Sequence, residues 1–126
     1  MAKPTPNLDL LRRVLRQIDS DPDRWNQYTW GCRAAAPQCG TSYCVGGWAC
    51  VLAKQSLVWD ESQAYHVERD GKHCDIHDVA RDLLGLTGLE ADTLFDCHNK
   101  RGDIEHIAQR IAARAGEPLW PEEARP

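Results

Sequence analysis

The chain is 126 residues long, with 27% charged residues and a formal net charge of −4 at pH 7, which is the size of one ordinary domain that can bury a core without disulfides or metal. Its mildly acidic balance argues against a broad binding surface for nucleic acid or anionic lipid. The start of the chain lacks the apolar core of a signal peptide, and no apolar run approaches the roughly 18 residues of a membrane span, so we expect a single cytoplasmic domain without membrane contact.

The first expected element is an amphipathic helix that follows a short irregular arm, residues 1–6. Apolar residues recur there at a helical period: Leu8, Leu11, Val14, Leu15 and Ile18. Asn7 is suited to cap this helix, which should end before Pro22. Three arginines lie on the opposite face: Arg12, Arg13 and Arg16. They form either an ordinary solvated face or a site for an acidic partner.

Three aromatic residues, Trp25, Tyr28 and Trp30, follow this helix without a clean period. They can form a lid over the core, because aromatic side chains bury a large area in irregular segments. Alternatively they form an exposed contact surface, where Trp and Tyr often supply much of the binding energy. With the nearby arginine face they make up the expected partner-binding set: Arg12, Arg16, Trp25, Tyr28 and Trp30. Within it we expect Trp30 to be structural and Tyr28 and Arg16 to be more exposed.

The segment from Cys39 to Ala53 contains no charged residue and is expected to be a buried central helix over residues 41–53. Thr41 can cap it, and apolar residues recur behind the cap at helical spacing. Gly46 and Gly47 would each destabilise a helix interior by roughly 1 kcal/mol relative to Ala. We therefore expect another element to pack close to the backbone there.

The second half of the chain predicts a small β-hairpin near residues 56–73 and then more helix. Short β-favourable runs surround the turn signal Asp70-Gly71. A helix should follow and end at Gly85, and Thr87 with Glu90 matches the capping box of the next helix. Asp103 can cap a last helix, after which residues 117–126 form an irregular tail.

These elements together predict a mainly α fold: one compact domain, residues 1–126, of about five helices around the central helix at 41–53. The hairpin is expected to be an appendage, because its strands are short.

The six cysteines are expected to be free thiols, metal ligands or a redox pair, because cytoplasmic disulfides are rare. Cys39 and Cys44 surround the expected start of the central helix, where the helix dipole would favour a thiolate at Cys44. They form either a redox pair or ordinary core packing, since cysteine is a small apolar side chain. As an alternative, a zinc site could use four nitrogen and sulfur ligands: Cys74, His77, Cys97 and His98.

Three segments together resemble a family of small uncharacterised proteins of actinobacteria and their phages: DRWNQYTW at 23–30, CGTSYCVGGWA at 39–49 and DVARDLLGLTGLEADTLF at 78–95. The resemblance covers most of the chain, and its marker is the motif C-G-T-x-x-C-x-x-G-W-A. It implies a lineage and a cytoplasmic location and no mechanism. For a phage protein it would mean binding and modulating a host protein.

The sequence carries no phosphate-binding loop, no G-x-S-x-G and no H-E-x-x-H pattern. The expected function is therefore a small cytoplasmic protein-interaction module that is not an enzyme, needs no cofactor and binds a protein partner. The alternative is a zinc-binding or thiol-redox module that uses the cysteine and histidine clusters. A small enzyme with an unfamiliar site is the third reading.

Overall fold

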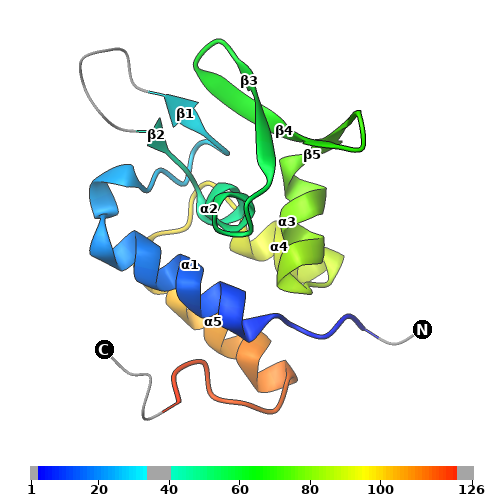
Figure 1. Cartoon of the computed structure of the whole chain (residues 1–126). Helices are drawn as coiled ribbons and strands as arrows, with labels where there is room; N and C mark the ends of the chain where they lie inside the picture. Colours follow the sequence, from blue (N-terminus) through cyan, green and yellow to red (C-terminus); the bar gives the residue numbers. More distant parts are fainter. Residues whose placement is uncertain (1–2, 34–40, 122–126) are drawn as a thin grey trace.

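The computed structural model describes residues 3–33 and 41–121 (Figure 1). The described residues form five α-helices, a short 3₁₀ turn and five strands: α1 (Leu8–Ser20), η1 (Pro22–Arg24), β1 (Cys32–Arg33), β2 (Thr41–Ser42), α2 (Val45–Leu52), β3 (Ser56–Asp60), β4 (Gln63–Arg69), β5 (Lys72–Asp75), α3 (Ile76–Leu84), α4 (Gly88–Leu94) and α5 (Arg101–Arg114). The fold is thus a mixture of α and β structure.

The expectation of a mainly α fold with a small hairpin is wrong, because the strands join into one five-stranded antiparallel sheet. β4 pairs with β3 and β5, and Cys32 of β1 pairs with Gln63 at the start of β4. β1 in turn pairs with β2. Ala64 and Val67 of β4 are fully buried, so the sheet contributes to the core and is no appendage.

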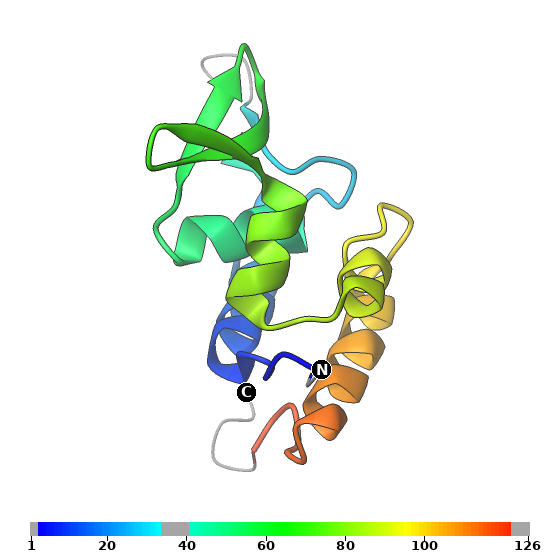
Figure 2. The ribbon, with the colours of Figure 1, turned by 90° about the vertical axis from the view of Figure 1, so that its right-hand side faces the viewer.

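The sheet lies at one end of the molecule, α2 and α3 lie beneath it, and α1 and α5 lie farther away (Figure 1). Figure 2 shows α4 and α5 forming a column beside α3. In the same view the segment around residues 25–30 and the segment after α4 approach each other from different sides. Helices far apart in the sequence thus bring two irregular segments together.

The first helix confirms the prediction from periodicity. α1 buries six residues on one side: Leu8, Leu10, Leu11, Val14, Leu15 and Ile18. Its cap is Asn7, whose side-chain oxygen accepts a hydrogen bond from the Leu10 backbone N–H at 3.1 Å. Such a cap typically stabilises a helix by about 1 kcal/mol.

The central helix is shorter than expected, because Thr41 and Ser42 belong to β2 and pair with β1. α2 begins at Val45, and its N-cap is Cys44 instead of Thr41. The expected close approach at its glycines is confirmed. A Cβ on Gly46 would lie 2.5 Å from the Trp30 ring, and one on Gly47 would overlap the Trp30 carbonyl oxygen.

The next two helices end and begin where the sequence predicts. α3 ends at Gly85, which adopts the left-handed conformation with φ 65°. Thr87 and Glu90 form the expected capping box of α4. The last helix begins at Arg101, so Asp103 is not its N-cap; the Asp103 carboxylate instead accepts the Lys100 backbone N–H at 2.9 Å.

Residues 117–121 have no helix or strand, but they are held against the body. Leu119 is buried, and Arg12 of α1 donates hydrogen bonds to the carbonyl oxygens of Pro118 and Leu119. The Arg16 guanidinium lies 5.3 Å from the ring centre of Trp120. In the ranges 3–33 and 41–121, no helix has both the length and the apolar character needed to cross a membrane.

Candidate interaction groove

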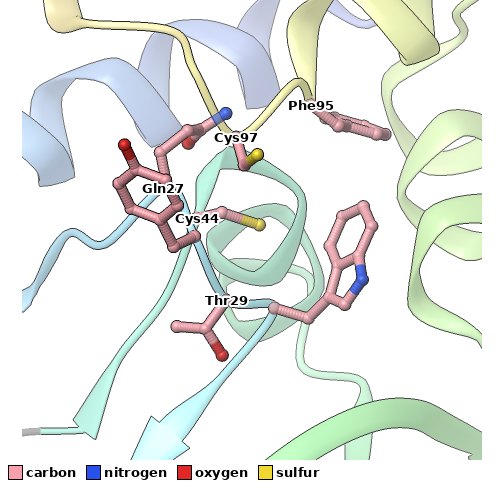
Figure 3. A pocket seen from close by; sticks show the side chains of 7 residues that line it. Gln27, Thr29, Cys44, Phe95 and Cys97 are labelled. Carbon is pink, nitrogen blue, oxygen red and sulfur yellow. The ribbon is translucent and has the colours of Figure 1, made fainter.

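Two adjoining hollows lie between the segment 25–30 and the segment 95–101, and we call them together the groove. The smaller hollow has a volume of about 110 Å³ and is lined by Gln27, Tyr28, Thr29, Trp30, Cys44, Phe95 and Cys97 (Figure 3). The larger has a volume of about 320 Å³ and is lined by Trp25, Asn26, Gln27, Tyr28, Cys97, His98, Asn99, Lys100 and Arg101. Gln27, Tyr28 and Cys97 line both hollows, so the two are continuous.

The first wall of the groove, residues 25–30, is held by backbone hydrogen bonds to the strand–helix junction before α2. The Asn26 N–H donates to the Tyr43 carbonyl at 3.0 Å, and the Cys44 N–H donates to the Thr29 carbonyl at 2.9 Å. The Asn26 side chain closes a local turn by accepting the Tyr28 N–H at 3.0 Å. An irregular segment is thereby fixed in one conformation.

Gln27 connects both walls of the groove to the core. Among residues 3–33 and 41–121, Gln27 is the only polar residue that is buried, and it is 6% exposed. Its Oε1 accepts hydrogen bonds from Trp25 Nε1 at 3.0 Å and from the Val45 N–H at 3.2 Å. Its Nε2 donates to the carbonyl oxygens of Leu94 and Asp96 at 3.1 and 3.2 Å. One amide therefore ties the first wall to the start of α2 and to the end of α4.

The second wall, residues 95–101, is fixed by its own side chains. Asn99 Nδ2 donates to the carbonyl oxygens of Thr93 and Leu94 at 2.7 and 3.1 Å. Arg101 makes a bidentate contact with Asp19 of α1, with distances of 2.8 and 2.9 Å. The hydrogen bonds from Arg101 to Asp19 raise the pKa of Arg101, and this cation stays charged at the edge of the larger hollow.

The rings of Trp30 and Phe95 form the apolar end of the smaller hollow. Trp30 meets Phe95 edge to face with ring centres 5.6 Å apart, and His77 contacts both rings at 6.0 and 5.5 Å. Trp30 also covers Gly46 and Gly47, as described above. The expectation that Trp30 is structural agrees with this packing.

The two thiols in the groove differ in their environment. Cys44 is 2% exposed, and its sulfur accepts a hydrogen bond from the Gly47 N–H at 3.4 Å. Burial nevertheless raises the pKa of Cys44 to about 12, which is opposite to the thiolate expected at the start of a helix. Cys97 is half-buried and lines both hollows. The second member of the expected redox pair, Cys39, lies outside the described residues.

The four ligands expected for zinc do not come together. Cys74 lies on β5, and His77 at the start of α3 pairs with Asp92 through Nε2 at 3.0 Å. Cys97 and His98 instead meet Asp96, and in residues 3–33 and 41–121 this trio is the one group of three such residues whose ligand atoms all lie within 4.8 Å of one another. Asp96 was missing from the expected set because carboxylates are too common for spacing to single one out.

Asp96, Cys97 and His98 do not have the geometry of a catalytic triad, in which a nucleophile, a general base and an acid that orients the base act in line. In such a triad the histidine uses one ring nitrogen for the nucleophile and the other for the acid. Here the Asp96 carboxylate and the Cys97 sulfur both contact Nδ1 of His98, at 3.0 and 3.7 Å. Hydrogen bonds from the backbone and ring N–H groups of His98 lower the pKa of Asp96. The arrangement thus suits shared binding of a cation better than proton transfer.

The structure separates the expected partner-binding residues into three settings. Arg12 and Arg16 contact the C-terminal segment 117–120. Trp30 packs on α2. Trp25 and Tyr28 line the groove, and Tyr28 is 75% exposed. Sequence reasoning missed Gln27, Phe95 and Lys100, because nothing in the local pattern shows that residues 25–30 and 95–101 meet.

Comparison of the chain with protein-family models, with curated proteins and with solved structures found no match. Its function must therefore be inferred from the groove itself.

Proposed function

We propose that the protein is a cytoplasmic, non-enzymatic interaction module that holds a segment of a protein partner in the groove. The observation that carries this proposal is Tyr28, which is 75% exposed although it stands at the lip of an apolar hollow. Tyr and Trp supply a large share of binding energy when a partner removes water from them. Trp25 and Tyr28 are thus anchors on the first wall.

The volume of the smaller hollow favours a single side chain over a whole substrate or cofactor as its occupant. Sites for small molecules usually measure about 300–1,000 Å³, and the smaller hollow has about 110 Å³. An apolar cavity of about 150 Å³ holds a benzene ring. One apolar side chain of a partner therefore fits the smaller hollow.

The larger hollow suits the chain on either side of that apolar residue. Its lining combines amide groups of Asn26 and Asn99 with the cations Lys100 and Arg101. Amides can bond to a peptide backbone, and Lys100 favours an acidic residue beside the apolar one, whereas Arg101 already pairs with Asp19 and Glu105. If the chain is of the phage type that its motif resembles, the partner is a host protein whose activity it modulates.

The direct test places a photoreactive amino acid at position 28 in the full-length protein, in cells that contain the partner. The matched control is position 65, because Tyr65 is also an exposed aromatic residue, 51% exposed, but lies on the sheet. We expect a discrete crosslinked partner from position 28 and none from position 65. Purified Tyr28→Ala should then bind that partner at least about tenfold more weakly, a loss typical of a binding hot spot.

Two outcomes would contradict the proposal. Equal crosslinking from both positions would place the interface elsewhere, and so would unchanged affinity of Tyr28→Ala for the identified partner. Tyr28→Ala and Tyr65→Ala should both keep the melting temperature of the parent protein, because both side chains are exposed. A loss of binding can then be assigned to contact and not to unfolding.

A further inference from the structure

Three consecutive residues after α4 bring a carboxylate, a thiol and an imidazole to one point. The Asp96 carboxylate oxygen lies 3.0 Å from Nδ1 of His98, and the Cys97 sulfur lies 3.7 Å from the same nitrogen. All three ligand atoms are within 4.8 Å of one another. Neighbouring side chains on an extended segment point apart, so this convergence requires the tight turn described next.

The turn is held by contacts inside and outside the trio. Oδ1 of Asp96 also accepts the His98 backbone N–H at 2.8 Å, and the Asn99 N–H donates to the Asp96 carbonyl at 3.2 Å. Gln27 donates to that same carbonyl from the core. Hydrogen bonds within the chain therefore fix the backbone that carries the three ligands, as a preorganised site requires.

The distances fit a tetrahedral zinc ion. Zinc–sulfur and zinc–nitrogen bonds of about 2.3 and 2.05 Å place the two ligand atoms roughly 3.6 Å apart at the tetrahedral angle. For a zinc–nitrogen and a zinc–oxygen bond at the same angle, the nitrogen and the carboxylate oxygen lie roughly 3.4 Å apart. The observed 3.7 and 3.0 Å differ from these two values by only a few tenths of an ångström.

We propose that Asp96, Cys97 and His98 bind one zinc ion or a similar borderline-soft divalent cation. A thiolate with an imidazole and a carboxylate selects zinc-like ions over magnesium or calcium, which prefer oxygen ligands alone. On binding, Cys97 releases its thiol proton to solvent, and the neutral His98 ring carries its proton on Nε2 in place of Nδ1, so that Nδ1 gives up its hydrogen bond to Asp96 and binds the ion. The trio lies outside the buried core, so we expect a binding site and not a structural one.

Three protein ligands leave one position of the tetrahedron open. Cys97 and His98 both line the larger hollow, so that position can be filled from the groove by water or by a donor atom of a bound segment. The ion would then add a third kind of contact beside Tyr28 and the cations. The metal site itself does not depend on the proposed function, because the ligands all belong to this chain.

Cobalt titration of the full-length, fully reduced protein tests the site, because cobalt(II) replaces zinc and its thiolate charge-transfer band reports a bound sulfur. We expect the band to saturate at one equivalent and to disappear when zinc is added. Cys97→Ser should abolish the band. His98→Gln and Asp96→Asn should weaken binding at least about tenfold, since even residues that only support ligands contribute that much.

Matched variants keep the experiment decisive. Cys74→Ser removes another half-buried thiol, and His106→Gln removes another exposed imidazole, so both should bind cobalt as the parent does. Asn at position 96 can still accept the His98 N–H, so Asp96→Asn tests the charge and not the turn. Circular dichroism should be the same for all variants. A charge-transfer band that survives Cys97→Ser, or no stoichiometric binding by the parent, would overturn the proposal.

Discussion

Gly47 determines how closely the first wall of the groove approaches α2. A Cβ at this position would overlap the Trp30 carbonyl oxygen and lie 3.0 Å from the Trp30 carbonyl carbon. Backbone atoms cannot rotate away as a flexible side chain can, so the wall or the helix must shift. We expect Gly47→Ala to destabilise the fold by about 1–3 kcal/mol, the usual effect of overpacking, as measured by urea denaturation.

Gly102 provides the control for that substitution. It also lies in the first turn of a helix, α5, but a Cβ there meets nothing within 4 Å. Gly102→Ala should stabilise the protein by up to about 1 kcal/mol, because alanine loses less backbone freedom on folding. If both alanine variants had the same stability, the close approach at Gly47 would be disproved.

The cysteines are expected to react in the order of their exposure. Cys44 keeps its proton because burial raises its pKa to about 12, whereas Cys97 is half-buried and lines the groove. In metal-free protein at mildly alkaline pH, iodoacetamide should therefore alkylate Cys97 in the native state and Cys44 only after denaturation. Mass spectrometry of peptides after timed alkylation measures this order, and early modification of Cys44 would contradict it.

The helices were the most predictable elements, because each signal was local. The periodicity of Leu8 to Ile18 and the Thr87–Glu90 capping box lie within single elements and were both confirmed. Thr41 was misassigned because a good N-cap can equally start a short strand. Here Thr41 pairs with Arg33, across residues 34–40, and no local pattern reveals such a partner.

Gln27 links three elements with one side chain. A substitution of Gln27 should therefore destabilise the protein more than is usual for a polar residue. In Gln27→Glu one carboxylate oxygen keeps the contacts to Trp25 and Val45. The other replaces the amide nitrogen, so at neutral pH it faces the carbonyl oxygens of Leu94 and Asp96. Each unsatisfied buried group typically costs about 1–3 kcal/mol. We expect Gln27→Glu to lower the free energy of unfolding by at least one such increment at neutral pH.

Acid should partly restore this variant. Burial beside carbonyl oxygens raises the pKa of the introduced glutamate in the folded state above its value in the unfolded chain. The protonated form is therefore favoured by folding, and stability is higher at low pH and is lost as pH rises through the folded pKa. Gln109→Glu, on the exposed side of α5, is the control and should show a much smaller acid recovery relative to the parent, because its repulsion with Glu105 is screened by solvent. A variant as stable as the parent at neutral pH would contradict the role of Gln27.

At the scale of the whole molecule, the sheet was missed because its strands are short and their partners distant. β1 and β2 have two residues each, and β5 is the polar sequence Lys72–Asp75. Such strands have little propensity of their own and exist because β4 pairs with neighbours on both sides. The groove was missed for the same reason, since its two walls are about seventy residues apart and only tertiary structure brings them together.

Arg114 of α5 joins three segments that lie far apart in the sequence. It pairs with both carboxylate oxygens of Glu90 at 2.7 and 2.8 Å and donates to the carbonyl oxygens of Pro4 and Gly85. Glu90 also accepts the Thr87 N–H at 2.9 Å. Burial raises the pKa of Glu90, but the hydrogen bonds from Arg114 and Thr87 outweigh it, so the pKa lies below 4.5.

A lowered pKa means that the ionised carboxylate is favoured by folding. The stabilisation by Glu90 should be complete above about pH 4.5 and be lost as pH falls through the folded pKa. At neutral pH, Glu90→Gln should be less stable than the parent by about 1–3 kcal/mol, the range of hydrogen bonds to charged groups. Urea denaturation at a series of pH values should show this difference shrinking in acid. Glu117→Gln is the control, because Glu117 is exposed and lies 3.8 Å from Arg12, so its effect should stay within about 0.5 kcal/mol at every pH. A stability difference for Glu90→Gln that does not change with pH would show that the neutral hydrogen bonds, and not the charge, hold this end of the molecule together.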